Sequence, residues 1–244
     1  MSQNKINRNQ IIKKESNALA RAGNTLKITE KIIEENNERL IVSEIKSVKI
    51  GDQIWMTENL NVGRFRNGDP IPEARTDEEW EKAGQEGKPA WCFNENDPNN
   101  EELYGRLYNW FAVTDHRGLT PMGWHIPSDE EWEILCDSLG GSDLAGKKMK
   151  NDTGWDLVSE FLAKYDMEYF GDSGTNESGL KFFPGGARDS YGRFWHPGYD
   201  GYFWTSTLRD KKIWRIAISQ GTDRVSKSSE YADCGLSIRC IKDC

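Results

Sequence analysis

The spacing of apolar residues differs sharply between the start of the chain and the rest. Residues 6–45 are predicted to form a helix, or a helical hairpin if Gly23 and Asn24 break it. Large aliphatic side chains recur there at steps of seven, the heptad interval of helices that pack along one stripe: Ile12, Leu19, Leu26, Ile33 and Leu40. The other core position of each heptad is poor in apolar residues, which argues against a long two-stranded coiled coil. The stripe is therefore expected to dock on another copy, on a partner protein or on the chain's own domain.

From residue 47 onward the pattern is that of an α+β domain with few helices, short antiparallel strands and much irregular loop. Every Trp, Tyr, Phe and Pro lies beyond residue 50, so the two parts cannot build the same kind of core. The alternating stretch VKIGDQIWMTENLNV predicts a strand or the start of a hairpin. We therefore expect a helical segment over residues 1–46 and a single domain over residues 47–244.

Helix and strand signals follow along this domain. TDEEWEKAG and PSDEEWEILCDSLGG both place a hydroxyl residue and acids before an apolar stripe, and Ser128 with Glu131 has the spacing of a capping box. Strand-like pieces beyond residue 180 are GLKFFPGG, YFWTSTL, KIWRIAI and GLSIRCIKD. Buried packing is the expectation for five indole rings: Trp55, Trp110, Trp124, Trp132 and Trp204.

Charge and hydropathy restrict the partners. Residues 1–50 hold 10 Lys/Arg and 6 Asp/Glu, a net of +4, so the chain total of −8 leaves −12 on residues 51–244. Because nucleic-acid affinity depends largely on cations, we expect no nucleic-acid partner for the domain. No apolar run approaches the ~20 residues of a membrane helix, and the first residues lack the apolar stretch of a secretory signal. We expect no membrane insertion and a cytoplasmic location.

Six blocks of the domain, in this order, carry a resemblance to a known family: IGDQIWMTENLNV, YGRLYNWFAV, PMGWHIPSDEEWEIL, FFPGGARDSYGRF, GYFWTST and GLSIRCIKD. Over roughly residues 47–243 the chain resembles the Fibrobacter succinogenes major paralogous domain. That family is similar to C-type lectin-like folds related to the formylglycine-generating enzyme type. The resemblance implies that the two ends of the domain pair in one small sheet while long loops rest on a second. Relatives include the variable proteins of diversity-generating retroelements, whose last part forms a lectin-like face varied to bind different ligands.

The aromatic and charged residues near the end of the chain are the candidates for such a face. Tyr and Trp offer stiff, amphipathic contact area, and Arg adds forked donors. The interleaved glycines are typical of shaped loops. The candidate ligand-binding residues are Tyr191, Arg193, Trp195, His196, Tyr199, Arg209, Asp210, Trp214, Arg215, Arg224, Lys227, Tyr231 and Asp233. The ligand is expected to be a protein or a cell-surface molecule.

An oxidase or oxygenase of the formylglycine-generating type is the alternative that the resemblance leaves open, with Cys234 and Cys240 as its pair. The alternating pattern around Cys240 favours instead an inward-facing strand residue. The odd total of five cysteines favours free thiols. Cys136, on the apolar stripe of its helix, is expected to approach Cys240, as a disulfide if oxidised or as a buried thiol if reduced.

Other catalytic or metal-binding patterns are weak. No two of His116, His125 and His196 have a helical metal-binding spacing, and we expect His125 to make hydrogen bonds in a packed loop. The oxygens of residues 94–102 could hold calcium, but they lack the ligand order of an EF-hand. The sequence therefore favours a non-catalytic binding protein without a metal or other cofactor.

Overall fold

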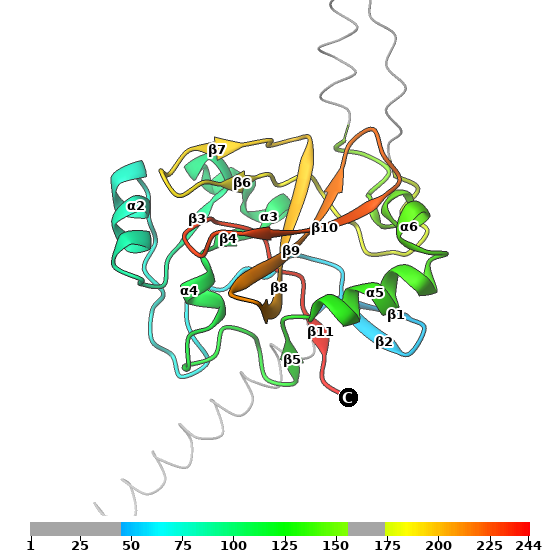
Figure 1. The fold of residues 1–244 in the computed structure, drawn as a ribbon, viewed down its shortest axis with the longest axis horizontal. Coiled ribbons are helices and arrows are strands. Elements are labelled where there is room, and N and C mark those ends of the chain that lie inside the picture. The colour runs from blue at the N-terminus through cyan, green and yellow to red at the C-terminus, as the bar shows by residue number, and fades with distance from the viewer. Residues whose placement is uncertain (1–44, 156–173) are drawn as a thin grey trace, which may run out of the picture. The chain divides into compact units, whose positions relative to one another are not determined.

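A computed structural model describes residues 45–155 and 174–244, of which Lys46–Cys244 belong to one compact unit (Figure 1). The predicted helical segment over residues 6–45 lies, but for its last residue, outside the described residues. The unit has few helices and several short antiparallel sheets, so the predicted α+β class is confirmed. Its elements are β1 (Ser47–Ile50), β2 (Gln53–Met56), α2 (Asp77–Gln85), β3 (Trp91–Phe93), η1 (Asn94–Asn96), η2 (Pro98–Asn100), α3 (Glu101–Tyr104), β4 (Arg106–Tyr108), α4 (Trp110–Val113), β5 (Trp124–His125), α5 (Asp129–Ser138), α6 (Ser142–Met149), β6 (Ala187–Arg188), β7 (Phe194–Trp195), β8 (Asp200–Arg209), β9 (Lys212–Ser219), β10 (Val225–Glu230) and β11 (Ile241–Lys242).

A four-stranded antiparallel sheet in the order β1-β2-β11-β5 joins the two ends of the unit. The alternating stretch after residue 47 forms the β1–β2 hairpin, as predicted. Ile241 of β11 pairs with Trp55 of β2 on one side and with His125 of β5 on the other. The His125 ring lies 2.7 Å from a carboxylate oxygen of Asp243 and 2.9 Å from one of Glu131, which confirms its predicted hydrogen bonding. The residue lies in β5, however, and not in the loop that was predicted.

A three-stranded sheet in the order β10-β9-β8 forms the second layer of strands. The pieces YFWTSTL and KIWRIAI lie in β8 and β9, as predicted. A tight turn joins them, with Asp210 at φ 54° and Lys211 at φ 61°. β10 was not predicted, because its sequence VSKSSE is polar and buries little beyond Val225.

Two capping boxes fix the starts of the longer helices. In α2 the Thr76 side chain accepts from the Glu79 amide, and in α5 Ser128 does the same for Glu131. In both boxes the glutamate side chain bonds back to the backbone of the capping residue. After α5 the chain turns through Gly140 at φ 103°, a conformation that favours glycine. The predicted helix starts and the predicted helix end are therefore confirmed.

The main core lies between α5 and the two larger sheets. Trp132 of α5 packs against Trp55 of β2 at 4.8 Å between ring centroids and against Phe203 of β8 at 5.8 Å. Trp204 is fully buried, and its indole N–H donates to the carbonyl of Tyr108 at 2.7 Å. All five tryptophans that were expected in the core are buried.

Two of the strand predictions hold only in part. GLKFFPGG forms isolated bridges, at Phe182 and Gly186, and no strand. GLSIRCIKD does supply the closing strand β11, which pairs with β2, but the strand is only two residues long. Cys240 is buried, as expected, but so is every residue from Gly235 to Ile241, so the segment does not alternate between core and solvent.

Arg239 explains why this segment is buried on both sides. Its guanidinium donates to the carbonyls of Met56 and Leu180 at 3.1 and 2.9 Å and stacks 4.3 Å from the ring centre of Phe182. A charged residue can lie in the core when its donors are satisfied in this way. Among the described residues, no helix is both long and apolar enough to span a bilayer.

Candidate functional site

The predicted ligand-binding residues lie on three parts of the fold. Tyr191, Arg193, Trp195, His196 and Tyr199 belong to the β6–β7 hairpin and to the link into β8. The others lie on the β8–β9 hairpin, on β10 and beside its ends. Successive side chains of a strand point to opposite faces, so the adjacent residues Trp214 and Arg215 cannot share one surface. The structure accordingly divides the set into two groups.

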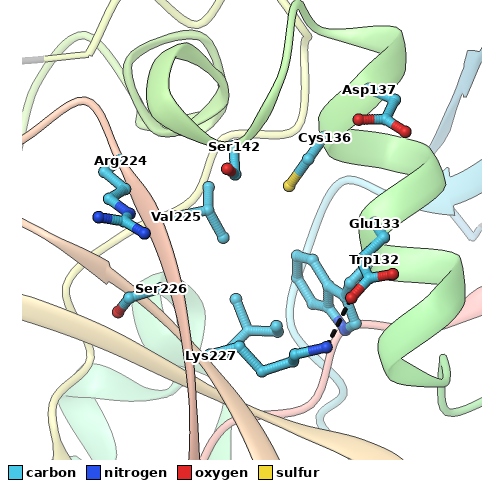
Figure 2. Close-up of a pocket in the computed structure, with 10 residues that line it drawn as sticks. Trp132, Glu133, Cys136, Asp137, Ser142, Arg224, Val225, Ser226 and Lys227 are labelled. Atoms are coloured by element: carbon cyan, nitrogen blue, oxygen red, sulfur yellow. Dashed lines mark hydrogen bonds and ion pairs between the residues drawn. The ribbon is translucent and has the colours of Figure 1, made fainter.

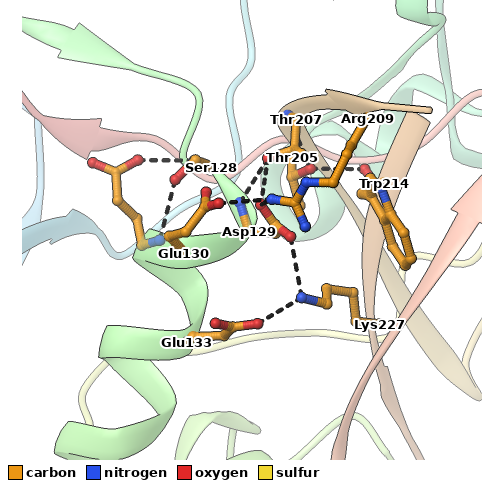
Figure 3. A network of polar contacts seen from close by, with 10 residues as sticks. Ser128, Asp129, Glu130, Glu133, Thr205, Thr207, Arg209, Trp214 and Lys227 are labelled. Carbon is orange, nitrogen blue, oxygen red and sulfur yellow. Dashed lines mark hydrogen bonds and ion pairs between the residues drawn. The ribbon is translucent and has the colours of Figure 1, made fainter. Parts of the chain in front are cut away.

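The first group faces α5. Asp129, the first residue of that helix, is the centre of a polar network (Figure 3). Asp129 is 1% exposed and accepts from the Thr207 hydroxyl at 2.7 Å and from the Lys227 ammonium at 3.1 Å. Lys227 also pairs with Glu133 at 2.5 Å, and Arg209 pairs with Glu130 at 2.7 Å. Arg209 and Lys227 therefore attach the sheet to α5.

The same contacts control the protonation of Asp129. Burial alone would raise the pKa of this carboxyl, but the hydrogen bonds from Thr207 and Lys227 outweigh burial and hold the pKa at about 2. The Lys227 ammonium lies 5.5 Å from the ring centre of Trp214, so this ring belongs to the α5-facing group.

The second group lies on the opposite face of the sheet and consists of a ring cluster, which we define as Trp195, Tyr202 and Arg215. The two rings are 4.6 Å apart between centroids, and the Arg215 guanidinium lies 4.4 Å from the centre of the Tyr202 ring. Arg215 also donates to Glu230 of β10 at 3.0 Å. The cluster thus joins the β6–β7 hairpin to all three strands of the sheet.

A histidine and a carboxylate lie at the margin of the ring cluster. His196 Nδ1 is 2.5 Å from Asp200 Oδ2, and the Tyr202 hydroxyl donates to the same oxygen at 2.7 Å. Burial and the hydrogen bond to Asp200 both raise the pKa of Tyr202, so its phenol stays protonated and remains a donor. His196 has a φ of 56° and its side chain is about half exposed, so the imidazole is presented to solvent in a fixed orientation.

Arg188 holds the β6–β7 hairpin in place. Its fully buried guanidinium donates to the carbonyls of Gly192 and Ala74, both at 2.8 Å, and to the Asp77 carboxylate at 3.2 Å. It also lies 4.9 Å from the centre of the Trp80 ring. The hairpin is therefore fixed against the start of α2, although its tip is open to solvent.

Three large exposed side chains are predicted site residues. Tyr191 is 64% exposed, Tyr199 39% and Tyr231 75%. Tyr191 and Tyr199 come from the hairpin and its link to β8, and Tyr231 directly follows β10. Exposed tyrosines on short, anchored loops are typical of protein-recognition surfaces.

Trp195 and Trp214 are less exposed than the sequence suggested. Both rings are half-buried, and the indole N–H of each is buried without a hydrogen-bond partner among the described residues. They contribute packing against Tyr202 and Lys227, respectively, as well as surface. The remaining candidates are separate from both groups: Arg193 and Asp210 are exposed, Arg224 lies 3.6 Å from Asp143, and the Asp233 carbonyl accepts from Trp80.

The cysteines are all free thiols, so Cys136 and Cys240 are not bridged. Cys234 and Cys240 are buried at 4% and 0% exposure, and the Cys234 thiol donates to Glu230 at 3.5 Å. Burial raises the pKa of Cys240 to about 12, and burial with the nearby Glu230 raises that of Cys234. In the described ranges no three His, Cys, Asp or Glu side chains are grouped as metal ligands would be.

Several residues of these networks were not predicted from the sequence. Tyr202 lies in the aromatic run GYFWTST, where composition does not distinguish the ring that faces the hairpin from the ring in the core. Asp129 was interpreted only as part of a helix start, because its partners Thr207 and Lys227 are 78 and 98 residues away along the chain. Strand alternation in β8 was the one signal that could have separated Tyr202 from Phe203.

The comparison with protein-family models gives one finding. The model of the Fibrobacter succinogenes major domain matches residues 48–242, which is most of the chain and nearly all of the compact unit. Searches of curated proteins and of solved structures find no match to the chain. The match contains both networks described above and, apart from Ser47, all strands of the two larger sheets. The chain therefore belongs to the Fibrobacter succinogenes major domain family.

Proposed function

We propose that the chain is a non-catalytic ligand-binding protein that displays a recognition face on a C-type lectin-like scaffold. The observation that carries the proposal is the combination of an anchored ring cluster with three exposed tyrosines around it, Tyr191, Tyr199 and Tyr231. Such a face offers a large aromatic contact area at small entropic cost, because Arg188 already fixes the hairpin that carries it.

The scaffold part of the proposal is supported by the sheet topology. The β1–β2 hairpin pairs with β11 in one small sheet, and the candidate face lies on a second sheet that is built from β8, β9 and β10. The long irregular connections between these sheets agree with the arrangement that the family resemblance implies. The resemblance also suggests that the face is the variable region of a retroelement-diversified protein.

The oxidase alternative receives no support from the two cysteines it would use. A copper-binding cysteine must lose its proton, and the surroundings of Cys234 and Cys240 raise the pKa of both thiols. Cys234 neighbours the Glu230 carboxylate, whereas Cys240 neighbours the guanidinium of Arg239. Both thiols act as small buried groups in this proposal.

Photo-crosslinking tests the recognition face. Benzoylphenylalanine replaces Tyr191 or Tyr231 in one set of proteins and Met122, which is 60% exposed on a loop before β5, in the control. Each protein is irradiated in a lysate and in a surface fraction of the source cells. We expect the same adduct from both tyrosine positions and none from Met122.

Competition makes this experiment specific. An excess of the unlabelled chain should abolish the adduct, whereas the same excess of a Tyr191→Ser, Tyr231→Ser variant should not. That variant should keep the melting temperature of the parent, because both side chains are exposed. Adducts that form equally at Met122, or that the variant also abolishes, would overturn the proposed face. For the diversification part, sequencing the neighbouring DNA must find a reverse transcriptase gene and a near-repeat of the last coding stretch.

A further inference from the structure

The two outer strands of the three-stranded sheet have different surroundings. The outer edge of β8 is bridged at Gly201 to Gly186 and at Phe203 to Ser237. β10 pairs with β9 over its six residues, and no backbone hydrogen bond joins its other edge to another segment in the ranges that the structure describes. Alternate residues of an edge strand direct their N–H and C=O groups away from the sheet. α6 lies against the segment before β10, where the Gly146 N–H donates to the Asp223 carbonyl at 2.8 Å. The edge of β10 itself, from Val225 onward, is therefore a template for a further strand.

A pocket of about 470 Å³ lies beside this edge, between α5, the first residue of α6 and β10 (Figure 2). Three consecutive residues of β10 line one wall, Val225, Ser226 and Lys227, together with Arg224 just before the strand. Because side chains alternate along a strand, a pocket over one face would contact only every second residue. The pocket therefore extends around the edge of the strand, where an added chain would run.

The chemistry of the pocket defines the side chain that it would accept. Its buried lining is apolar and consists of Trp132, Cys136, Ile216 and Val225. The volume is in the range of sites that hold small ligands, so it has room for a branched or aromatic side chain.

The α5 side of the pocket is acidic. Glu133 is already paired with Lys227, but the exposed Asp137 carboxylate has no ion-pair partner among the residues described. The two cations of the lining are also paired, Lys227 with Glu133 and Arg224 with Asp143 at 3.6 Å, so Asp137 is the charged group of the lining that has no ion-pair partner in the described ranges. The chain has a net charge of −8, of which residues 1–50 contribute +4, so residues 51–244 carry −12. This negative charge also favours a basic partner.

We propose that an extended, basic segment of a partner protein adds to β10 as a fourth strand, places an apolar side chain in this pocket and sets a Lys or Arg against Asp137. Backbone hydrogen bonds to the free edge supply affinity, and the pocket supplies specificity. This surface lies on the α5 side of the sheet, away from the ring cluster, so the inference does not depend on the proposed function.

A phage-displayed library of random peptides of about eight residues, selected on the full chain, tests the surface. We expect enriched sequences with one large apolar residue and a Lys or Arg close to it. The affinity of the best synthetic peptide is then measured by fluorescence anisotropy. Ser142→Phe fills the exposed mouth of the pocket and should weaken binding about tenfold or more. Lys82→Phe, the same side chain at an exposed position of α2, should leave the affinity unchanged.

Proline substitutions test the strand addition. Of two adjacent residues such as Ser228 and Ser229, one directs its N–H to β9 and the other directs it outward. Proline at the outward position should keep the melting temperature and abolish peptide binding, whereas proline at the inward position should lower the melting temperature.

Three outcomes would overturn the proposal. The first is that no peptide is enriched. The second is that the selected peptide binds the folded proline variant or Ser142→Phe as well as it binds the parent. The third is that sedimentation shows self-association of the chain, which the outward proline abolishes and no peptide displaces, because the occupant would then be a second copy.

Discussion

Asp129→Asn should convert the buried charge at the start of α5 into a neutral group of nearly the same shape. The carboxylate is 1% exposed and accepts from Thr207 and Lys227 at 2.7 and 3.1 Å. The amide keeps an acceptor for the hydroxyl but presents no charge to the ammonium. The change therefore isolates the electrostatic part of the network.

The magnitude follows from the pKa of Asp129. A fall from the ordinary value of 3.8 to about 2, at about 1.4 kcal/mol per unit, corresponds to about 2 kcal/mol of stability. Because the folded-state pKa lies below the unfolded one, this contribution is complete above pH 4 and is lost as the pH falls toward 2. For a domain of this size, about 2 kcal/mol corresponds to a melting temperature lower by about 4–8 °C.

The assay is the free energy of unfolding from urea titrations between pH 7 and pH 2.5, for the parent and for Asp129→Asn. Asp137→Asn is the control, because this carboxylate lies on the same helix but is exposed. The control should stay within about 0.5 kcal/mol of the parent at every pH. The parent and Asp129→Asn should differ by about 2 kcal/mol at pH 7 and converge in acid. An equal loss at both ends of the pH range would refute the reasoning, because the damage would then come from packing and not from charge.

Four other outcomes can be measured. Trp204→Ala should lower the stability by about 3–5 kcal/mol, because the ring is fully buried and donates to Tyr108; an unchanged denaturation midpoint would contradict its place in the core. Lys211→Gly should raise the stability by about 1 kcal/mol, since φ 61° strains a side-chain-bearing residue; a lower melting temperature would show that the lysine makes a compensating contact. Ellman's reagent should label only Cys244 quickly in the native chain and all five thiols in denaturant, and rapid labelling of a second thiol would contradict the burial of the others. A fragment of residues 47–244 should show a cooperative thermal transition, and a non-cooperative melt would place the boundary elsewhere.

Local signals in the sequence predicted local structure well. The capping boxes at Thr76 and Ser128 involve residues three positions apart, so both helix starts were visible without knowledge of the fold. The apolar runs of β8 and β9 likewise carry their own signal. β10 has none, since VSKSSE becomes a strand only because β9 supplies its partner.

The candidate site was predictable in its composition but not in its geometry. The aromatic and basic residues near the end of the chain were found, yet their assignment to two faces depends on the register of β8, β9 and β10. Buried guanidiniums such as Arg188 and Arg239 are also invisible in a sequence, because arginine is ordinarily exposed and its partners are distant backbone carbonyls.

The pairing of β2 with β11 has a consequence for synthesis of the protein. Trp55 of β2 cannot pair with β11 until Ile241 has been synthesised. The carbonyl of Met56 likewise accepts a hydrogen bond from Arg239, which is 183 residues later in the chain. Contacts of such long sequence separation form slowly, because closing the intervening chain costs entropy before any contact is gained. A nascent chain on the ribosome can form the local β1–β2 hairpin, but the other edge of β2 stays unpaired until β11 emerges. Chaperones that shield exposed apolar surface should accordingly bind the nascent chain and release it only after residues 239–241 have emerged.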